Sequence, residues 1–280
     1  MNIRETANAV TRAVEWEFAH STYAQVLADV PGALFPYWVA TAHHEFPGIP
    51  RDASFYAQSV EGLMMFFDCV AAAGRRCALP SRAADSVWHA WARLDAPGLD
   101  RFCIRHFGRG IPHVERAHMQ GDMGLALAVC LVQARRRASQ PAAGTHLPRL
   151  FSLDGQLGMP GGFGYRVIGG LVACSTLDEF GNPEDKLGFP GELAPYALYV
   201  SGLVSKDEYD AAALPGGVRE RRCVADDGAA IIGAGVYLDI AGTDDDGASG
   251  DGAAPPDGGS SWSGSACGGS SCGGGGCGSS

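Results

Sequence analysis

Apolar residues recur at helical spacing through most of the first 140 positions of the chain. The spacing predicts one helix over 1–30, a shorter helix over 33–45 and a long helix over 53–74. The 53–74 stretch is apolar on nearly every face. A helix of that kind has to be covered by neighbours on most sides, so we expect it at the centre of the fold.

Two further helices are marked by residues that begin and end helices. Ser81 is a candidate N-cap for a helix that runs to about residue 94. Asp95 has the same place before a second helix over 96–107, with Pro97 in the first turn and Gly108 just past the end. One or two more helices are expected over 113–138.

The hydrophobic pattern changes after residue 140. Between 150 and 180 glycine is frequent, and the apolar residues form short groups, RLFSLDG and YRVIGGLVACST. These groups predict two or three short strands joined by glycine turns. Helical spacing then returns, and Ser205 and Glu208 have the spacing of a capping box that places a helix start at Lys206. The expected fold class is mainly α with a small α+β region.

The C-terminal part of the chain differs from the rest in composition. From Val224 onward there are eight Asp and no Lys, Arg, Glu or His, and Gly and Ser dominate beyond Ala241. Such a segment cannot offset the roughly 1–2 kcal/mol of backbone entropy that each ordered residue loses. We therefore predict a helical domain over 1–140, a small α+β region over 141–222, and a disordered, acidic, Gly/Ser/Cys-rich tail over 223–280.

Charge and hydropathy exclude several classes of partner. The net charge is −10, of which the tail carries −8, so residues 1–223 carry only −2 and have no basic stripe for nucleic acid. The N-terminus lacks a signal-peptide core, and no apolar run reaches the roughly 18–20 residues of a membrane span. We expect a soluble, cytoplasmic protein with mostly reduced cysteines. Its partner would be a protein or a small molecule, with no nucleic acid and no membrane.

The densest group of chemically capable side chains lies between residues 85 and 118. In chain order the candidates are Asp85, His89, Cys103, His106, His113 and His118. The first two are four residues apart and the next two are three apart, so each pair shares a helix face. Together these side chains could supply the three or four ligands that Zn²⁺ requires. No HExxH or H-x-x-x-H motif is present, so the spacing alone does not select a ligand set.

The same stretch also has the composition of a packed helical core. Trp88 and Trp91 are spaced as core residues. His106 would then be a cation at a helix C-terminus, and His89 a partly buried histidine bonded to Asp85.

Three tail cysteines form a second candidate metal site. Cys267, Cys272 and Cys277 recur every five residues on a glycine-rich background. Three thiols could capture Cu(I) or Zn²⁺ at the entropic cost of ordering the chain. They could equally be targets of thiol modification, or belong to inert low-complexity sequence.

The pattern ALPSRAADSVWHAW…LDRFCIRHFGRGIPHVE resembles a segment of bacterial glycine-rich-domain-containing proteins, a family of largely unknown function that also has Gly/Ser/Cys-rich tails. The matching positions are Pro80, Ser81, Asp85, Trp88, His89, Phe102, Cys103, Phe107, Gly108, Arg109 and His113. The family commonly has a second histidine two residues after the first, where this chain has Trp91. The resemblance covers about residues 78–118 and, by composition only, the tail, and it implies no activity.

Three hypotheses follow for function, and whether the protein is an enzyme stays open among them. The first is a non-enzymatic binding or scaffold protein with a low-complexity tail. The second is a metal-binding protein or metal-dependent enzyme with Zn²⁺ as the expected ion. Its ligands would come from the cluster Asp85, His89, Cys103, His106 and His113. The third is a tail whose thiols are themselves modified.

Overall fold

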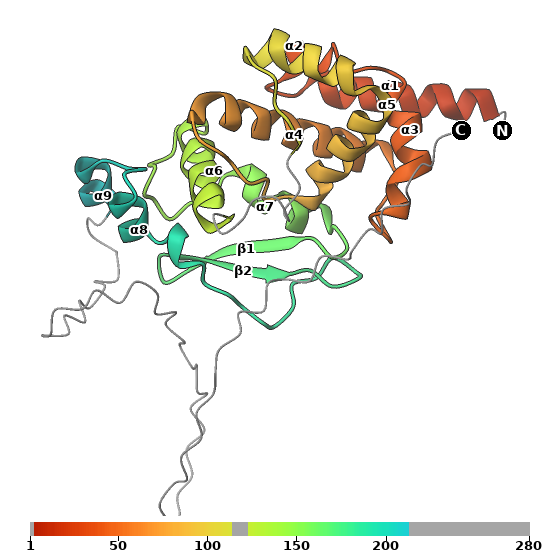
Figure 1. The fold of residues 1–280 in the computed structure, drawn as a ribbon. Coiled ribbons are helices and arrows are strands. Elements are labelled where there is room, and N and C mark those ends of the chain that lie inside the picture. Colours follow the sequence, from red (N-terminus) through yellow and green to blue (C-terminus); the bar gives the residue numbers. More distant parts are fainter. Residues whose placement is uncertain (1–2, 114–122, 213–280) are drawn as a thin grey trace, which may run out of the picture. The chain divides into compact units, whose positions relative to one another are not determined.

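Helix α4 (Ala53–Ala73) is the element around which the others pack. The structure is a computed structural model that describes residues 3–113 and 123–212 (Figure 1). The Asp52 carboxylate caps α4 by accepting the Phe55 N–H at 2.9 Å, and Gly74 ends it with a left-handed φ of 59°. The helix is buried on most faces and contacts α1, α5, α6 and α7. The predicted central helix is confirmed.

The remaining helices surround α4 on several sides. In chain order they are α1 (Ile3–Ala19), α2 (Ala24–Leu27), α3 (Leu34–Thr41), η1 (Ala42–His44), α5 (Arg82–Phe107), α6 (Met123–Arg137), α7 (Arg149–Leu157), η3 (Gly191–Leu193), α8 (Pro195–Val200) and α9 (Lys206–Ala212). The predicted helix start at Lys206 is confirmed, because the Ser205 hydroxyl and the Glu208 carboxylate exchange hydrogen bonds with each other's backbone N–H groups. No helix in the described part of the chain is long and apolar enough to cross a membrane.

The first helix is shorter than its sequence pattern predicts. The pattern predicts one helix over 1–30, whereas α1 ends at Ala19 and the short α2 follows after a turn. Ser21 lies in this turn, where its hydroxyl accepts the Tyr23 N–H at 3.0 Å and donates to Glu61 at 2.5 Å. The serine therefore satisfies a backbone group outside a helix, which is why the single long helix is wrong.

Helix α5 consists of two halves that meet at Asp95. Asp95 has non-helical backbone angles (φ −158°, ψ 78°), and its carboxylate caps the second half by accepting the Gly98 N–H at 2.9 Å. Ser81 caps the first half through the Ala84 N–H at 3.1 Å, and Gly108 ends the second half with φ 76°. All three residues act as the sequence predicts.

A buried carboxylate fixes the start of α5. Asp154, on α7, accepts hydrogen bonds from the Ser81 hydroxyl at 2.6 Å and from three backbone N–H groups at 2.8–3.0 Å, those of Arg82, Ala83 and Phe163. Burial raises the pKa of Asp154, and these hydrogen bonds oppose that effect. The contacts join α7, the start of the first strand and the first turn of α5, one turn before Asp85.

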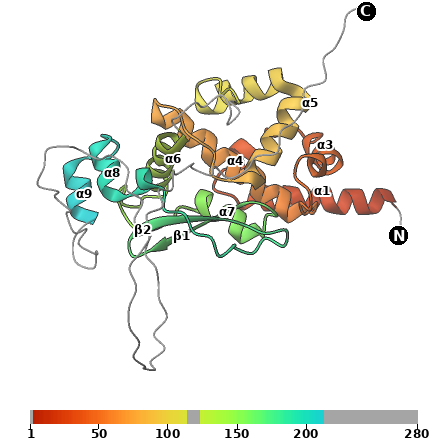
Figure 2. The same cartoon turned by 60° about the horizontal axis from the view of Figure 1, so that its bottom comes forward.

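The sheet is a single antiparallel hairpin within the described residues. Strands β1 (Phe163–Ile168) and β2 (Leu171–Thr176) pair from Phe163↔Thr176 to Ile168↔Leu171. Gly169 and Gly170 both have positive φ in the turn, as a tight two-residue hairpin requires. Figures 1 and 2 show the hairpin beside α7, which it contacts. The prediction of strands in the YRVIGGLVACST group is confirmed.

The RLFSLDG group is helical rather than extended, so its assignment to a strand is wrong. These residues form most of α7, whose buried apolar residues Leu150 and Leu153 lie three apart on one helix face. That face packs on α4, where the Cβ of any larger residue at Gly62 would lie 2.3 Å from Leu153. The spacing of three between the two leucines indicates a helix, whereas the short length of the group had favoured a strand.

One hydrophobic core cluster includes buried side chains from both sides of residue 140. Trp38, Phe67 and Trp91 contribute from the N-terminal side, and Phe151 and Leu198 from the C-terminal side. The boundaries at 140 and 222 stay predictions. Residues 114–122, which include His118, and residues 213–280, which include the three tail cysteines, lie outside the described residues.

Candidate metal centre

The first half of α5 places Asp85 and His89 side by side. They are one turn apart, and the Asp85 Oδ2 to His89 Nε2 distance is 3.6 Å. Their side chains are 32% and 27% exposed, so the pair is open to solvent on one side. The predicted meeting of these two side chains is confirmed.

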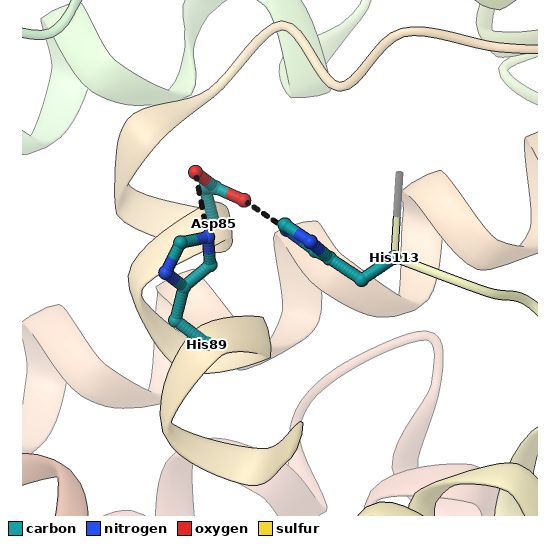
Figure 3. Close-up of side chains that lie close together, drawn as sticks. All are labelled: Asp85, His89 and His113. Atoms are coloured by element: carbon teal, nitrogen blue, oxygen red, sulfur yellow. Dashed lines mark hydrogen bonds and ion pairs between the residues drawn. The ribbon is translucent and has the colours of Figure 1, made fainter. Parts of the chain in front are cut away.

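His113 reaches the same carboxylate from a different part of the chain. After Gly108 the backbone turns back along α5, and the Ile111 backbone forms a hydrogen bond with the Cys103 thiol. The His113 Nε2 then lies 3.2 Å from Asp85 Oδ1 (Figure 3). The ring also packs edge-to-face against Trp88 and His89, with centroid separations of 4.5 and 4.6 Å.

A second carboxylate, that of Glu45, orients His89. Glu45 follows η1, and its Oε2 lies 2.6 Å from His89 Nδ1. An ionised carboxylate can only accept a hydrogen bond, so Nδ1 carries the proton in this contact. The Nε2 atom of the neutral ring then presents its lone pair toward Asp85. Arg93, one turn beyond His89, forms an ion pair with Glu45 and holds that carboxylate in place.

Asp85, His89 and His113 together have the geometry of a three-ligand metal site. One ligand atom from each lies within 4.8 Å of the other two. The Asp85 carboxylate faces the two rings through different oxygens: Oδ1 lies 3.2 Å from His113 Nε2, and Oδ2 lies 3.6 Å from His89 Nε2. Both separations are close to the roughly 3.3–3.5 Å between donors of a tetrahedral Zn²⁺ site with bonds of about 2.0–2.2 Å. Two imidazoles and one carboxylate suit Zn²⁺ and similar transition metals better than Ca²⁺ or Mg²⁺, which prefer oxygen ligands.

The second half of α5 does not bring its two candidates into this cluster. Cys103 is fully buried, and burial raises the pKa of its thiol to about 12. His106 turns instead toward Asp29, with its Nε2 3.0 Å from the Asp29 carboxylate. Among the described residues, the ligand set predicted from sequence therefore reduces to three of its five members.

No local sequence pattern marks Glu45 as part of the cluster. It lies 44 residues from His89 and follows the adjacent His43 and His44, in a short segment without a ligand motif. The contact exists because α3 and η1 pack on α5, where the Trp38 indole N–H donates to the Ser86 hydroxyl at 3.0 Å. Long-range packing of this kind leaves no local pattern in the chain.

Comparisons with known proteins found one family model that matches part of the chain. A family model described as UCP032817-like matches residues 49–184. The matched stretch contains Asp85, His89 and His113 and leaves out Glu45. A search of curated proteins and a search of solved structures each found no match. The resemblance of residues 78–118 to glycine-rich-domain-containing proteins stays a prediction.

Proposed function

We propose that the protein binds one divalent transition metal ion, Zn²⁺ foremost, through Asp85, His89 and His113. The observation that carries the proposal is the convergence of these three ligand atoms within 4.8 Å. Support comes from Glu45, because metal-bound histidines commonly donate their second ring N–H to a carboxylate. Three protein ligands leave a coordination position for water or a substrate, as in catalytic zinc sites.

The ligand set also predicts how the site responds to acid. Both histidines must be neutral at Nε2 to bind an ion, so protons compete with the metal. We expect Zn²⁺ affinity to fall as the pH is lowered from 7 to 5. The loss should be steeper than for a site with one histidine, because two imidazoles have to lose protons.

The test measures Zn²⁺ by elemental analysis and by competition with a chromogenic chelator. It uses the full chain under reducing conditions, with Cys267, Cys272 and Cys277 replaced by Ser so that the tail thiols do not contribute. We expect one Zn²⁺ per chain, and at least a hundredfold weaker binding after His113→Gln. The matched control is His106→Gln, which changes a histidine of α5 that faces Asp29, and this variant should bind Zn²⁺ unchanged.

A second candidate, a binding or scaffold protein without a metal, is favoured by one feature of the same cluster. Asp85 lies beside both histidines, and a His89 ring protonated at both nitrogens would donate to Glu45 and Asp85 and hold the group together as an ion-pair and hydrogen-bond cluster without a metal ion. On that alternative neither histidine variant changes Zn²⁺ binding, while His89→Gln lowers the free energy of unfolding. Equal Zn²⁺ binding by the parent and His113→Gln, or none by either, would overturn the metal proposal.

A further inference from the structure

A cavity of about 310 Å³ lies among α1, the turn after it, α2, α4 and the first residue of α7. None of its lining residues belongs to the metal centre. Its volume is at the lower end of the range for small-molecule sites, which fits a ligand of metabolite size.

A fixed ion pair forms one wall of the cavity. The Glu61 side chain is only 10% exposed, and both of its carboxylate oxygens are occupied. Oε1 accepts the Ser21 hydroxyl at 2.5 Å, and Oε2 pairs with Arg149 Nη1 at 2.6 Å. Burying a carboxylate is expensive unless it is paired, so this contact holds the Arg149 guanidinium at the cavity.

The Arg149 guanidinium keeps donors for a ligand. Its side chain is 43% exposed, and its one ion pair within the described residues uses Nη1. A guanidinium has five N–H donors in a planar fork, which binds carboxylates well. Arg149 therefore offers the cavity an anchor for a carboxylate group.

The opposite charge is supplied by Glu17, on α1. Its Oε1 accepts the Ser54 hydroxyl at 3.2 Å, and within the described residues it has no ion pair. Ser54 in turn accepts the Gln58 amide N–H at 3.2 Å, so the Gln58 amide and the Glu17 carboxylate are held through the same hydroxyl. A lining carboxylate without a cation partner suits a ligand ammonium group.

The rest of the lining consists of His20 and three apolar residues, Phe18, Leu27 and Ala57. Leu27 and Ala57 are almost fully buried, so the apolar surface open to a ligand comes mainly from the half-buried Phe18. An aliphatic group placed against Phe18 would gain by removing that apolar surface from water.

We propose that this cavity binds a free α-amino acid with an aliphatic side chain, its carboxylate on Arg149 and its ammonium on Glu17. The ligand class follows from three features of one small cavity: the anchored Arg149 guanidinium, the Glu17 carboxylate without an ion pair, and the half-buried Phe18 side chain. The proposal is independent of the metal centre, because the two sites share no residue.

The test is isothermal titration of the full chain with L-leucine as the probe. Two analogues each remove one charged group: 4-methylpentanoate lacks the ammonium, and 3-methylbutylamine lacks the carboxylate. We expect L-leucine to bind with a Kd of about 1 mM or tighter and each analogue to bind at least about tenfold more weakly. Leucine binding that equals that of either analogue would contradict the two-point recognition.

Glu17→Gln tests the ammonium partner without removing the oxygen that accepts from Ser54. It should weaken L-leucine binding by about tenfold and leave binding of 4-methylpentanoate unchanged. The matched control is Glu15→Gln, an exposed residue on the same helix outside the lining, which should have no effect. His89→Gln should also leave leucine binding intact, so that failure of the metal proposal is distinguishable. Absence of binding by leucine, valine and methionine up to about 10 mM would overturn the proposal.

Discussion

The two halves of α5 carry similar pairs of metal-ligating residues and use them differently. In the first half, Asp85 and His89 meet each other and a third candidate ligand, His113, from the returning chain. In the second half, Cys103 points into the core and His106 contacts Asp29. Spacing along a helix decides which residues share a face, but neighbouring elements decide whether that face becomes a site.

The bend at Asp95 is the physical reason for the difference. Residues 85 and 103 are 18 positions apart, which is five full turns of an ideal helix at 3.6 residues per turn. A straight helix would therefore present Asp85 and Cys103 on one face. The non-helical backbone at Asp95 interrupts the helical periodicity, so the two halves turn these residues toward different neighbours.

The largest expected effect concerns the reactivity of the thiol in the second half of α5, compared with a thiol that precedes the helix. Because burial raises the pKa of Cys103 to about 12, the neutral thiol predominates at pH 8, and only the thiolate is an effective nucleophile. We expect iodoacetamide to alkylate Cys103 about a thousandfold more slowly than the partly exposed Cys77, followed by peptide mass spectrometry. The rate at Cys103 should rise with pH up to about 12, and comparable labelling of both thiols at pH 8 would contradict the burial of Cys103.

The next largest effect should come from the residue that anchors the first half. Asp154→Asn places an amide NH₂ among four hydrogen-bond donors, so we expect a loss of about 2–4 kcal/mol in the free energy of unfolding measured in urea. Asp95→Asn at the start of the second half is the matched control. Asn is as good an N-cap as Asp, and Asp95 is 46% exposed, so the change should stay within about 0.5 kcal/mol. Equal losses would mean that both halves are anchored alike.

How far the sequence predicted the fold depended on how local each signal was. Ser81, Asp95 and Gly108 mark the limits of the α5 halves because caps act within one turn. The sequence pattern favoured a strand for the helical region at 149–157, because its apolar residues form a short group in which only Leu150 and Leu153 are a helical turn apart before Gly155. The prediction of a single first helix missed the turn at Ser21, which depends on a contact with Glu61 some 40 residues away.

The residues of the candidate site also differ in whether local spacing or long-range packing brings them together. The meeting of Asp85 and His89 followed from their spacing of four. The arrival of His113 depends on a reversal after Gly108 and on the small Gly110, where a Cβ would lie 2.5 Å from Asp100. Glu45 comes from the turn after η1, and no local sequence pattern marks it as a partner of His89. Sequence therefore predicted the helical pair and could not predict the carboxylate that orients it.

A smaller effect, on Zn²⁺ affinity, should distinguish the carboxylate that faces His89 from the one that faces His106. Glu45→Gln keeps a hydrogen-bond acceptor for His89 Nδ1 but removes the negative charge, which should weaken Zn²⁺ binding by about tenfold. Asp29→Asn makes the same change beside His106 and should leave Zn²⁺ affinity unchanged. Competition with a chelator at pH 7 measures both. A loss of equal size in the two variants would mean that the effect comes from net charge rather than from orientation of His89.

The smallest effect is expected for the stability contributed by Asp29 itself. The Asp29 side chain is 44% exposed and its second partner, Arg105, is 69% exposed, so solvent screens both ion pairs. We expect Asp29→Asn to lower the free energy of unfolding by no more than about 0.5–1 kcal/mol in urea. A double-mutant cycle with His106→Gln should give a coupling of similar size, which falls further in high salt. A coupling above about 2 kcal/mol would show that His106 is part of a tightly linked cluster after all, and the contrast between the two halves of α5 would then be one of partner rather than of strength.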